Sequence, residues 1–347
     1  MSTSDTSTLT IGYSALGISL PLFVADARGL FADQGLRVTM RGYPTAHPVV
    51  DEIIDGAAVP CGGIIALPIA LHRHARARPF FYAGAVVEDL EHPISFLLVR
   101  KGVEIRTLDD LAGRRVGTLP TKAYREWLKL LCKRRGLGYH QVVLDKTCQC
   151  MSTCASLEVP LDRLVSGCDV LPTDTVEALR SGKIDAVFTN DPAATAALRA
   201  EVAYLFGDRP LLPSELGSPF LFGSFVFDSH FVADEPGTVR RVVAALDEAV
   251  RQVRADERGA RRDAAAYLPR DCKLSDDGLG RPRYLTSDEV DAELLQAQLD
   301  LFAREGVIGE RVDIAPWLLR PGMPVGAGRS PGAAPRPPQR PAPACGS

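Results

Sequence analysis

The stretch TVEALRSGKIDAVFTNDPAA, residues 175–194, decides the fold class of this chain. Its first part has the apolar spacing of a helix, Gly182 turns the chain, and residues 184–190 form an apolar run of strand length. A second helix follows the strand. Residues 20–40, LPLFVADARGLFADQGLRVTM, repeat the step from helix through glycine to strand. Two such steps, far apart in the chain, predict an α/β fold with a mostly parallel sheet.

Further strands and helices alternate around these two stretches. Apolar runs predict strands at residues 8–16, 37–43, 57–63, 78–87, 93–101, 140–146 and 219–231. Helical spacing predicts helices at residues 46–56, 64–75, 121–135, 234–257 and 287–308. Pro68 should kink the helix at 64–75. The pattern restarts after residue 102, which indicates a second α/β unit.

We therefore predict two lobes, the second inserted into the first. Residues 1–102 and 218–325 would form lobe I, and residues 103–217 would form lobe II. The chain would cross between the lobes near 100–104 and 215–219. Residues 326–347 consist mainly of Pro, Ala, Gly and Arg, and this composition predicts a disordered tail.

Bulk composition excludes several function classes. The 347 residues carry 40 basic and 43 acidic side chains, a net charge of −3, which gives no electrostatic footprint for nucleic acid. No apolar run reaches the roughly 18 residues of a membrane span. The first residues, MSTSDTSTLTIGYS, lack the basic and apolar regions of a secretory signal. As the sequence stands we expect a cytoplasmic protein, or a periplasmic or cell-surface one if a leader is missing.

Three motifs carry a family resemblance. They are the GLF…GL.V step within residues 20–40, the ALRSGKIDA step that leads to Asp191 and Pro192, and LDDLAGRRVG at residues 108–117. Together they resemble the nitrate/sulfonate/taurine-type (NMT1/SsuA-like) solute-binding proteins over about residues 8–320. The resemblance implies the two-lobed type II periplasmic-binding-protein-like fold. It further implies a small anionic ligand, a sulfonate, sulfinate or carboxylate, in the cleft between the lobes, an ABC permease as partner, and a monomer.

The stretch DDLAGRRVGTLPTKAYREWL, residues 109–128, predicts an anion site on the second lobe. A short strand here leads into a helix start, where unpaired N–H groups and the helix dipole favour negative charge. Thr118 and Thr121 add hydroxyl groups and Lys122 adds a full positive charge. A plain turn with a solvent-facing lysine is the alternative. The other residues expected to contact the ligand follow strands or open helices: Ser14, Gly17, Ser19, His47, Cys61, Gly62, Asp191 and Ser224.

Binding without catalysis is the first prediction for function. The runner-up is a cytoplasmic enzyme, either biosynthetic or similar to the aromatic sulfinate desulfinase branch of the fold. The resemblance to that branch implies a nucleophilic Cys after the first strand, a His at a helix start and an Arg. Here the loop after the first strand has no Cys, His47 matches the His, and Pro60 stands at the Arg position. Cys61 is either a relocated nucleophile or a small buried apolar residue, and we expect it to lie apart from His47.

Four of the eight cysteines lie close together in the sequence: Cys148, Cys150, Cys154 and Cys168. Four thiolates can hold Zn²⁺ or an iron–sulfur cluster. The C-x-C-x₃-C spacing lacks the C-x₂-C step of common zinc and ferredoxin sites. We therefore expect ordinary thiols, no metal and no cofactor, with a thiolate metal site as the alternative.

Overall fold

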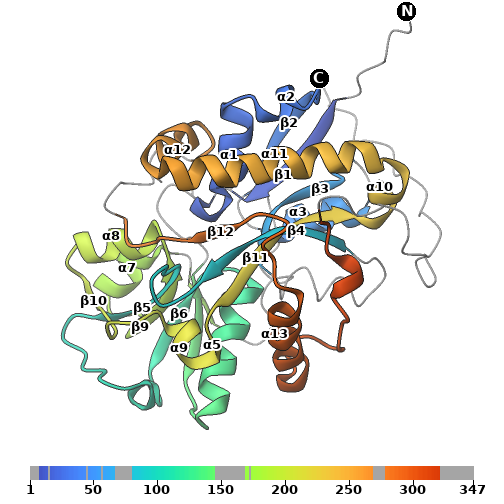
Figure 1. Ribbon diagram of the computed structural model, residues 1–347. Coiled ribbons are helices and arrows are strands. Elements are labelled where there is room, and N and C mark those ends of the chain that lie inside the picture. Colours follow the sequence, from blue (N-terminus) through green and yellow to red (C-terminus); the bar gives the residue numbers. More distant parts are fainter. Residues whose placement is uncertain are drawn as a thin grey trace, which may run out of the picture.

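The structure is a computed structural model that describes residues 8–14, 16–43, 46–55, 58–66, 80–144, 169–171, 173–268 and 278–320. Three predicted features lie outside these residues: the helix at 67–75 with its kink at Pro68, the cysteines at 148, 150, 154 and 168, and the tail at 326–347. The described chain contains two six-stranded sheets with helices packed around them (Figure 1). None of the described helices is long and apolar enough to cross a membrane.

Sheet A has the strand order β12-β4-β11-β3-β1-β2. The amino-terminal strands β1, β2 and β3 are parallel, whereas β11 runs antiparallel between β3 and β4, and β12 pairs antiparallel with β4. The bounds are β1 (Leu9–Ser14), β2 (Val38–Tyr43), β3 (Cys61–Ala66), β4 (Phe80–Glu88), β11 (Phe220–Asp228) and β12 (Arg283–Leu285). The prediction of a helix from residue 64 is wrong over Ile64–Ala66, because these residues continue β3 and pair with β11.

Sheet B has the strand order β10-β5-β9-β6-β7-β8. Four consecutive strands, β9, β6, β7 and the edge strand β8, are parallel, and β5 pairs antiparallel with both β9 and β10. The bounds are β5 (Ser95–Arg100), β6 (Arg115–Thr118), β7 (His140–Leu144), β8 (Asp169–Leu171), β9 (Ala186–Asn190) and β10 (Ala203–Leu205). The two parallel cores confirm the predicted α/β class.

The chain passes between the sheets twice. The first passage joins β4 to β5 through residues 89–94, and the second runs from α9 (Leu211–Leu216) to β11. The first passage comes earlier than the expected 100–104, because the apolar run of β5 pairs with β9 rather than with β4. The exact bounds of the predicted lobes stay a prediction.

Helices cover both sheets. Around sheet A, α1 and α11 pack against each other and α3 packs on β3. The helix expected in the first part of residues 20–40 is divided at Gly29, whose φ of +74° is left-handed. The bounds around sheet A are η1 (Gly17–Ser19), α1 (Leu20–Ala27), α2 (Leu30–Asp33), α3 (Ala46–Asp55), α10 (Ser229–Asp234), α11 (Pro236–Ala255), α12 (Glu257–Asp263), η4 (Ala264–Ala266) and η5 (Ala315–Trp317). The remaining helices are η2 (Leu108–Leu111), α5 (Lys122–Arg134), α7 (Thr175–Arg180), α8 (Ala193–Arg199) and α13 (Ala292–Glu305).

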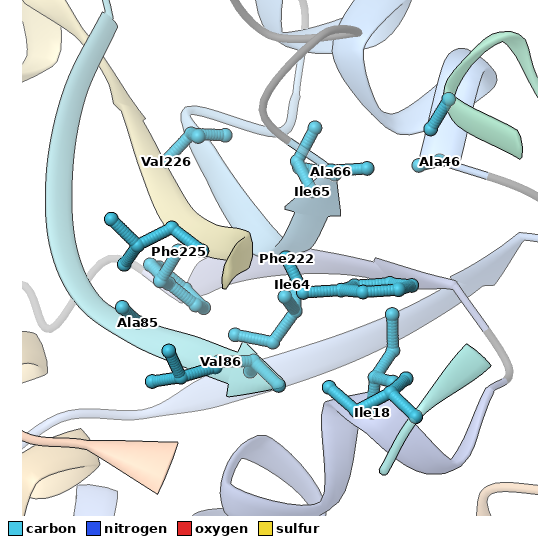
Figure 2. Packing of buried hydrophobic residues seen from close by; sticks show 14 of the residues in the cluster. Ile18, Ala46, Ile64, Ile65, Ala66, Ala85, Val86, Phe222, Phe225 and Val226 are labelled. Atoms are coloured by element: carbon cyan, nitrogen blue, oxygen red, sulfur yellow. The ribbon is translucent and has the colours of Figure 1, made fainter. Parts of the chain in front are cut away.

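The largest hydrophobic cluster fills the space between sheet A and its helices and reaches α5. Figure 2 shows side chains from η1, β3, β4 and β11 meeting there, among them Ile18, Ile64, Val86 and Phe225. A second cluster lies on one side of sheet B and includes residues of β5, β7, β9, α7 and α8. The site described next lies where the carboxyl ends of the strands of the two sheets approach each other.

Candidate ligand-binding site between the two sheets

Three strands end in buried polar side chains, each with an atom that has no hydrogen-bond partner among the described residues. Ser14 ends β1 and is 0% exposed, Thr118 ends β6 and is 0% exposed, and Asn190 ends β9 and is 3% exposed. The atoms without a partner are Ser14 Oγ, Thr118 Oγ1 and Asn190 Oδ1. A buried polar atom without a partner destabilises a protein by about 1–3 kcal/mol. In α/β proteins, ligands bind outside the carboxyl ends of strands, so these atoms mark a candidate ligand site.

The helix that follows β6 brings its amino-terminal end to this site. Thr121 has extended backbone angles and forms the N-cap of α5, and its Oγ1 accepts a hydrogen bond from Tyr124 N at 3.4 Å. Lys122 is the first helical residue and is half-buried. The α5 helix has 13 residues and no acidic residue in its first turn. Its dipole and first N–H groups therefore favour an anion here.

A cavity joins the two sheets at this level. Its volume is about 30 Å³, and its lining includes Gly17 after β1, Asn190 and Asp191 after β9, and Ile94 from the first passage. The lining is completed by Ile18, Leu20, Glu257, Arg261, Gly280, Pro282 and Tyr284. Residues from both sheets therefore surround one hollow.

An aromatic cluster lies beside the site and joins α5 to β9 and β11. The ring of Tyr124 lies 5.1 Å from that of Phe188, and the ring of Trp127 lies 4.8 Å from that of Phe222 and 5.3 Å from that of Phe220. All five rings are buried. Such packing fixes α5, and with it the helix start, against the second passage between the sheets.

A buried carboxyl group lies at the first passage. Glu88 ends β4, is 0% exposed, and accepts hydrogen bonds from the backbone N–H groups of Ile94 at 2.9 Å and Ser95 at 2.7 Å. Ser95 Oγ also donates to it, at 2.8 Å. Burial raises the pKa of Glu88 to about 7, although these donors oppose the rise. Burial also raises the pKa of Tyr124 well above its ordinary value, with smaller contributions from Glu88 and Asp191, and a side-chain hydrogen bond with Asn190 opposes the rise.

Several residues expected in the site have side chains engaged in the fold. Asp191 accepts from Thr195 Oγ1 at 2.6 Å and, through its other oxygen, from Gly280 N at 2.6 Å. Ser19 Oγ donates to the Ser14 carbonyl oxygen at 3.0 Å, and Ser224 Oγ donates to the Gly84 carbonyl oxygen at 2.7 Å. These contacts position the strand ends. Their role in holding a ligand stays a prediction.

The first-sheet residues around β3 also have structural surroundings. Cys61 is 0% exposed, and burial raises the pKa of its thiol, which disfavours the nucleophilic thiolate. A Cβ on Gly62 would lie 2.6 Å from Val49 Cγ1, so this glycine allows α3 to pack closely on the sheet. His47 lies in the first turn of α3 and is half-buried. The expected separation of Cys61 from His47 stays a prediction.

The chain is similar to known proteins in part of its sequence and in its fold. Residues 18–158 match the family described as NMT1/THI5 like. The alkanesulfonate-binding protein SsuA from Xanthomonas axonopodis pv. citri, bound to MOPS, superposes with a TM-score of 0.64 at 19% identity, covering 90% of this chain and 98% of SsuA. The chain has the periplasmic-binding-protein fold. This result confirms the fold and the family resemblance indicated by the three motifs.

Two other solved structures with this fold differ in their ligands. The periplasmic nitrate-binding protein NrtA from Synechocystis PCC 6803 has a TM-score of 0.58 at 11% identity, covering 89% of this chain and 84% of NrtA. A DszB variant in complex with biphenyl-2-sulfinic acid has a TM-score of 0.56 at 20% identity, covering 90% of this chain and 96% of DszB. The comparison with curated proteins gave no match.

The sequence pattern did not single out three buried polar residues, of which Asn190 lines the cavity. Asn190 ends an apolar strand immediately before Asp191, and a polar side chain at that position was a usable signal. Thr175 opens α7 just after β8, and its buried Oγ1 has no partner among the described residues. Tyr124 lies one turn inside α5, where its spacing indicated only a buried helix face.

The described residues contain no group of three or more His, Cys, Asp or Glu side chains that could hold a metal ion. The four clustered cysteines lie outside those residues, so the expectation about metal stays a prediction.

Proposed function

We propose that this chain binds a small anionic organic molecule, with a sulfonate, sulfinate or carboxylate group, between its two sheets. The observation that carries the proposal is the set of unpartnered buried atoms at three strand ends: Ser14 Oγ, Thr118 Oγ1 and Asn190 Oδ1. Two hydroxyl groups can donate to an anion, and an amide can present its NH₂ group by turning over.

The start of α5 supports the anionic character of the ligand. Thr118 lies one short turn before the N-cap Thr121, so its hydroxyl and the first helical N–H groups are close in the chain. The negative groups of the cavity are already occupied, because Asp191 accepts from Thr195 and Gly280, and Glu257 pairs with Arg261 at 2.6 Å. The neighbours SsuA and NrtA are named for sulfonate and nitrate binding, which agrees with this proposal.

Binding without catalysis is the form of the function that we favour. The thiol of Cys61 is fully buried in β3, and its pKa is raised, so it lacks the exposure and thiolate character of a nucleophile. The likeness to DszB keeps a desulfinase-like reaction as the alternative. Three further points stay proposals: partnership with an ABC permease, a monomeric state, and a cytoplasmic or periplasmic location. Light scattering tests the monomeric state, and cell fractionation tests the location.

The test is isothermal titration of the purified protein with MOPS, biphenyl-2-sulfinate, benzoate and nitrate. At least one organic anion should bind, and Thr118→Val should weaken that binding by roughly 10- to 100-fold, as expected for a lost hydrogen bond to a charged group. Thr189→Val is the matched control, because Thr189 is equally buried but lies on the opposite face of β9 from Asn190. Equal weakening in both variants, or binding that Thr118→Val leaves unchanged, contradicts the proposed site.

A further inference from the structure

The segment of residues 278–281 crosses from the sheet A side to the sheet B side. It directly precedes β12, which pairs with β4 at the edge of sheet A. Figure 1 shows this orange segment running from β12 towards α7 and α8, which belong to the sheet B side. The segment makes a third connection between the two parts of the molecule, in addition to the two passages of the chain.

Its backbone is held on the sheet B side by hydrogen bonds from consecutive residues. Leu279 N donates to Thr195 Oγ1 at 3.1 Å, and Gly280 N donates to Asp191 Oδ2 at 2.6 Å. Arg281 N donates to the carbonyl oxygen of Pro93, in the first passage, at 2.7 Å. A bond to an ionised carboxylate is roughly twice as strong as one between neutral groups, so the contact with Asp191 is the strongest of the three.

An apolar contact accompanies these bonds. Leu279 is half-buried and packs against the hydrophobic cluster of sheet B, which also includes Ala194 and Ala197 of α8. A leucine contributed by one side of the molecule therefore lies in the apolar cluster of the other. Moving the two sheets apart at this point would expose that leucine to water, which opposes the movement.

The other end of the segment is fixed to the sheet A side. Arg261 of α12 donates through Nη2 to the Gly280 carbonyl oxygen at 3.0 Å, and its side chain is only 8% exposed. Tyr284 donates its hydroxyl to the Gly17 carbonyl oxygen at 3.1 Å. Gly280, Pro282 and Tyr284 also line the cavity between the sheets, so the segment forms one wall of the candidate site.

We propose that residues 278–281 act as a latch that holds the two sheets in the arrangement described above and controls access to the cavity between them. Opening at this wall requires breaking the bonds to Thr195 and Asp191 and withdrawing Leu279 from its cluster. The control of access rests on the proposed function, whereas the latch itself does not. A weakened latch raises the open population of the ligand-free protein, and a ligand that contacts both sheets restores closure.

The test uses the full chain without ligand. Thr195→Val keeps the side-chain shape and removes both the acceptor of the Leu279 N–H and the hydroxyl that donates to Asp191. Leu279→Ala removes the apolar contact. Leu198→Ala is the matched control, because Leu198 packs against the same cluster from α8 and does not belong to the segment. We expect the double variant to exchange the amide hydrogens of residues 279–281 roughly tenfold faster and to have a larger radius of gyration by small-angle X-ray scattering. The control should change neither quantity.

Faster exchange with an unchanged radius of gyration overturns the latch, since the segment would then be loosened without opening. Unchanged exchange and radius overturn it as well. If circular dichroism shows that the double variant is unfolded, the same two measurements on Thr195→Val alone decide. Titration of MOPS into each variant tests the proposed function separately. Binding can fail while the ligand-free scattering still supports the latch, and the reverse outcome is equally distinguishable.

Discussion

Replacement of Glu88 by Gln should remove a strong pH dependence of stability. The glutamine keeps an oxygen for the N–H groups of Ile94 and Ser95, and its NH₂ group can donate to Ser95 Oγ. Burial raises the pKa of Glu88 from an ordinary 4.5 to about 7 in the folded protein. Because one pKa unit is 1.36 kcal/mol, this difference corresponds to about 3 kcal/mol.

The sign follows from proton linkage. Between these two values the folded protein keeps the proton on Glu88, whereas the unfolded chain has lost it, so the folded state binds more protons. The free energy of unfolding of the wild type should therefore fall by about 3 kcal/mol as the pH rises from about 4.5 to about 7, and this contribution should then level off. The glutamine variant lacks this contribution at every pH.

Urea unfolding followed by tryptophan fluorescence at pH values from 5 to 8 measures the effect. The difference in unfolding free energy between wild type and Glu88→Gln cancels the titration of the other groups, including the Asp89–His92 pair beside it. Glu91→Gln, an exposed neighbour in the same loop, is the control and should run parallel to the wild type. Parallel curves for wild type and Glu88→Gln would refute the assignment of a protonated carboxyl group at this passage.

Other substitutions test the remaining arguments. Thr118→Val should stabilise the ligand-free protein by roughly 1 kcal/mol in the same urea assay, because it removes a buried hydroxyl without a partner; destabilisation would mean that the hydroxyl has one. Cys61→Ser should cost about 1–3 kcal/mol of stability and leave the affinity for a bound anion within roughly 1 kcal/mol. Sulfite released from biphenyl-2-sulfinate by the wild type but not by Cys61→Ser would instead establish the enzyme. Gly62→Ala should cost about 1–3 kcal/mol by forcing Val49 and α3 away from the sheet, and an unchanged melting temperature would contradict this packing. Purified protein should contain less than about one equivalent of zinc or iron, and stoichiometric metal lost on replacing Cys148 and Cys150 would contradict the spacing argument.

The elements predicted well are those whose stability is decided by their own residues. The helix α11 carries nine buried residues at helical spacing, and α5 carries seven, so local periodicity was enough to place both. The strand β9 lies between a glycine turn and Asp191 and has five buried residues in succession, as a strand covered on both faces requires.

Failures arose where pairing partners are distant in the chain. Residues Ile64–Ala66 are apolar and compatible with a helix, but they form a strand because β11 arrives beside them. The apolar run of β5 is compatible with either sheet, and it belongs to sheet B because it pairs with β9. Periodicity within a short window contains no information about such partners.

The candidate site was predicted in part for the same reason. Thr118, Thr121 and Lys122 could be named because a strand that leads directly into a helix start is a local pattern. The hydrogen bond from Gly280 N to Asp191 could not be predicted, because nothing in the sequence around Gly280 indicates that this segment packs against β9 and α8. Ser14 and Asn190 belong to strands of different sheets, so no local pattern could relate them to one site.

The position of β11 between β3 and β4 has a consequence for synthesis on the ribosome. The strands of sheet B all come from residues 95–205, so that sheet can pair completely as soon as this continuous stretch has left the exit tunnel. Sheet A begins earlier in the chain, yet β3 and β4 keep open edges until β11, ending at residue 228, has been made. The nascent protein therefore finishes its second sheet before its first. During that interval the unpaired edges of β3 and β4 are the places where a chaperone, or another nascent chain, can attach.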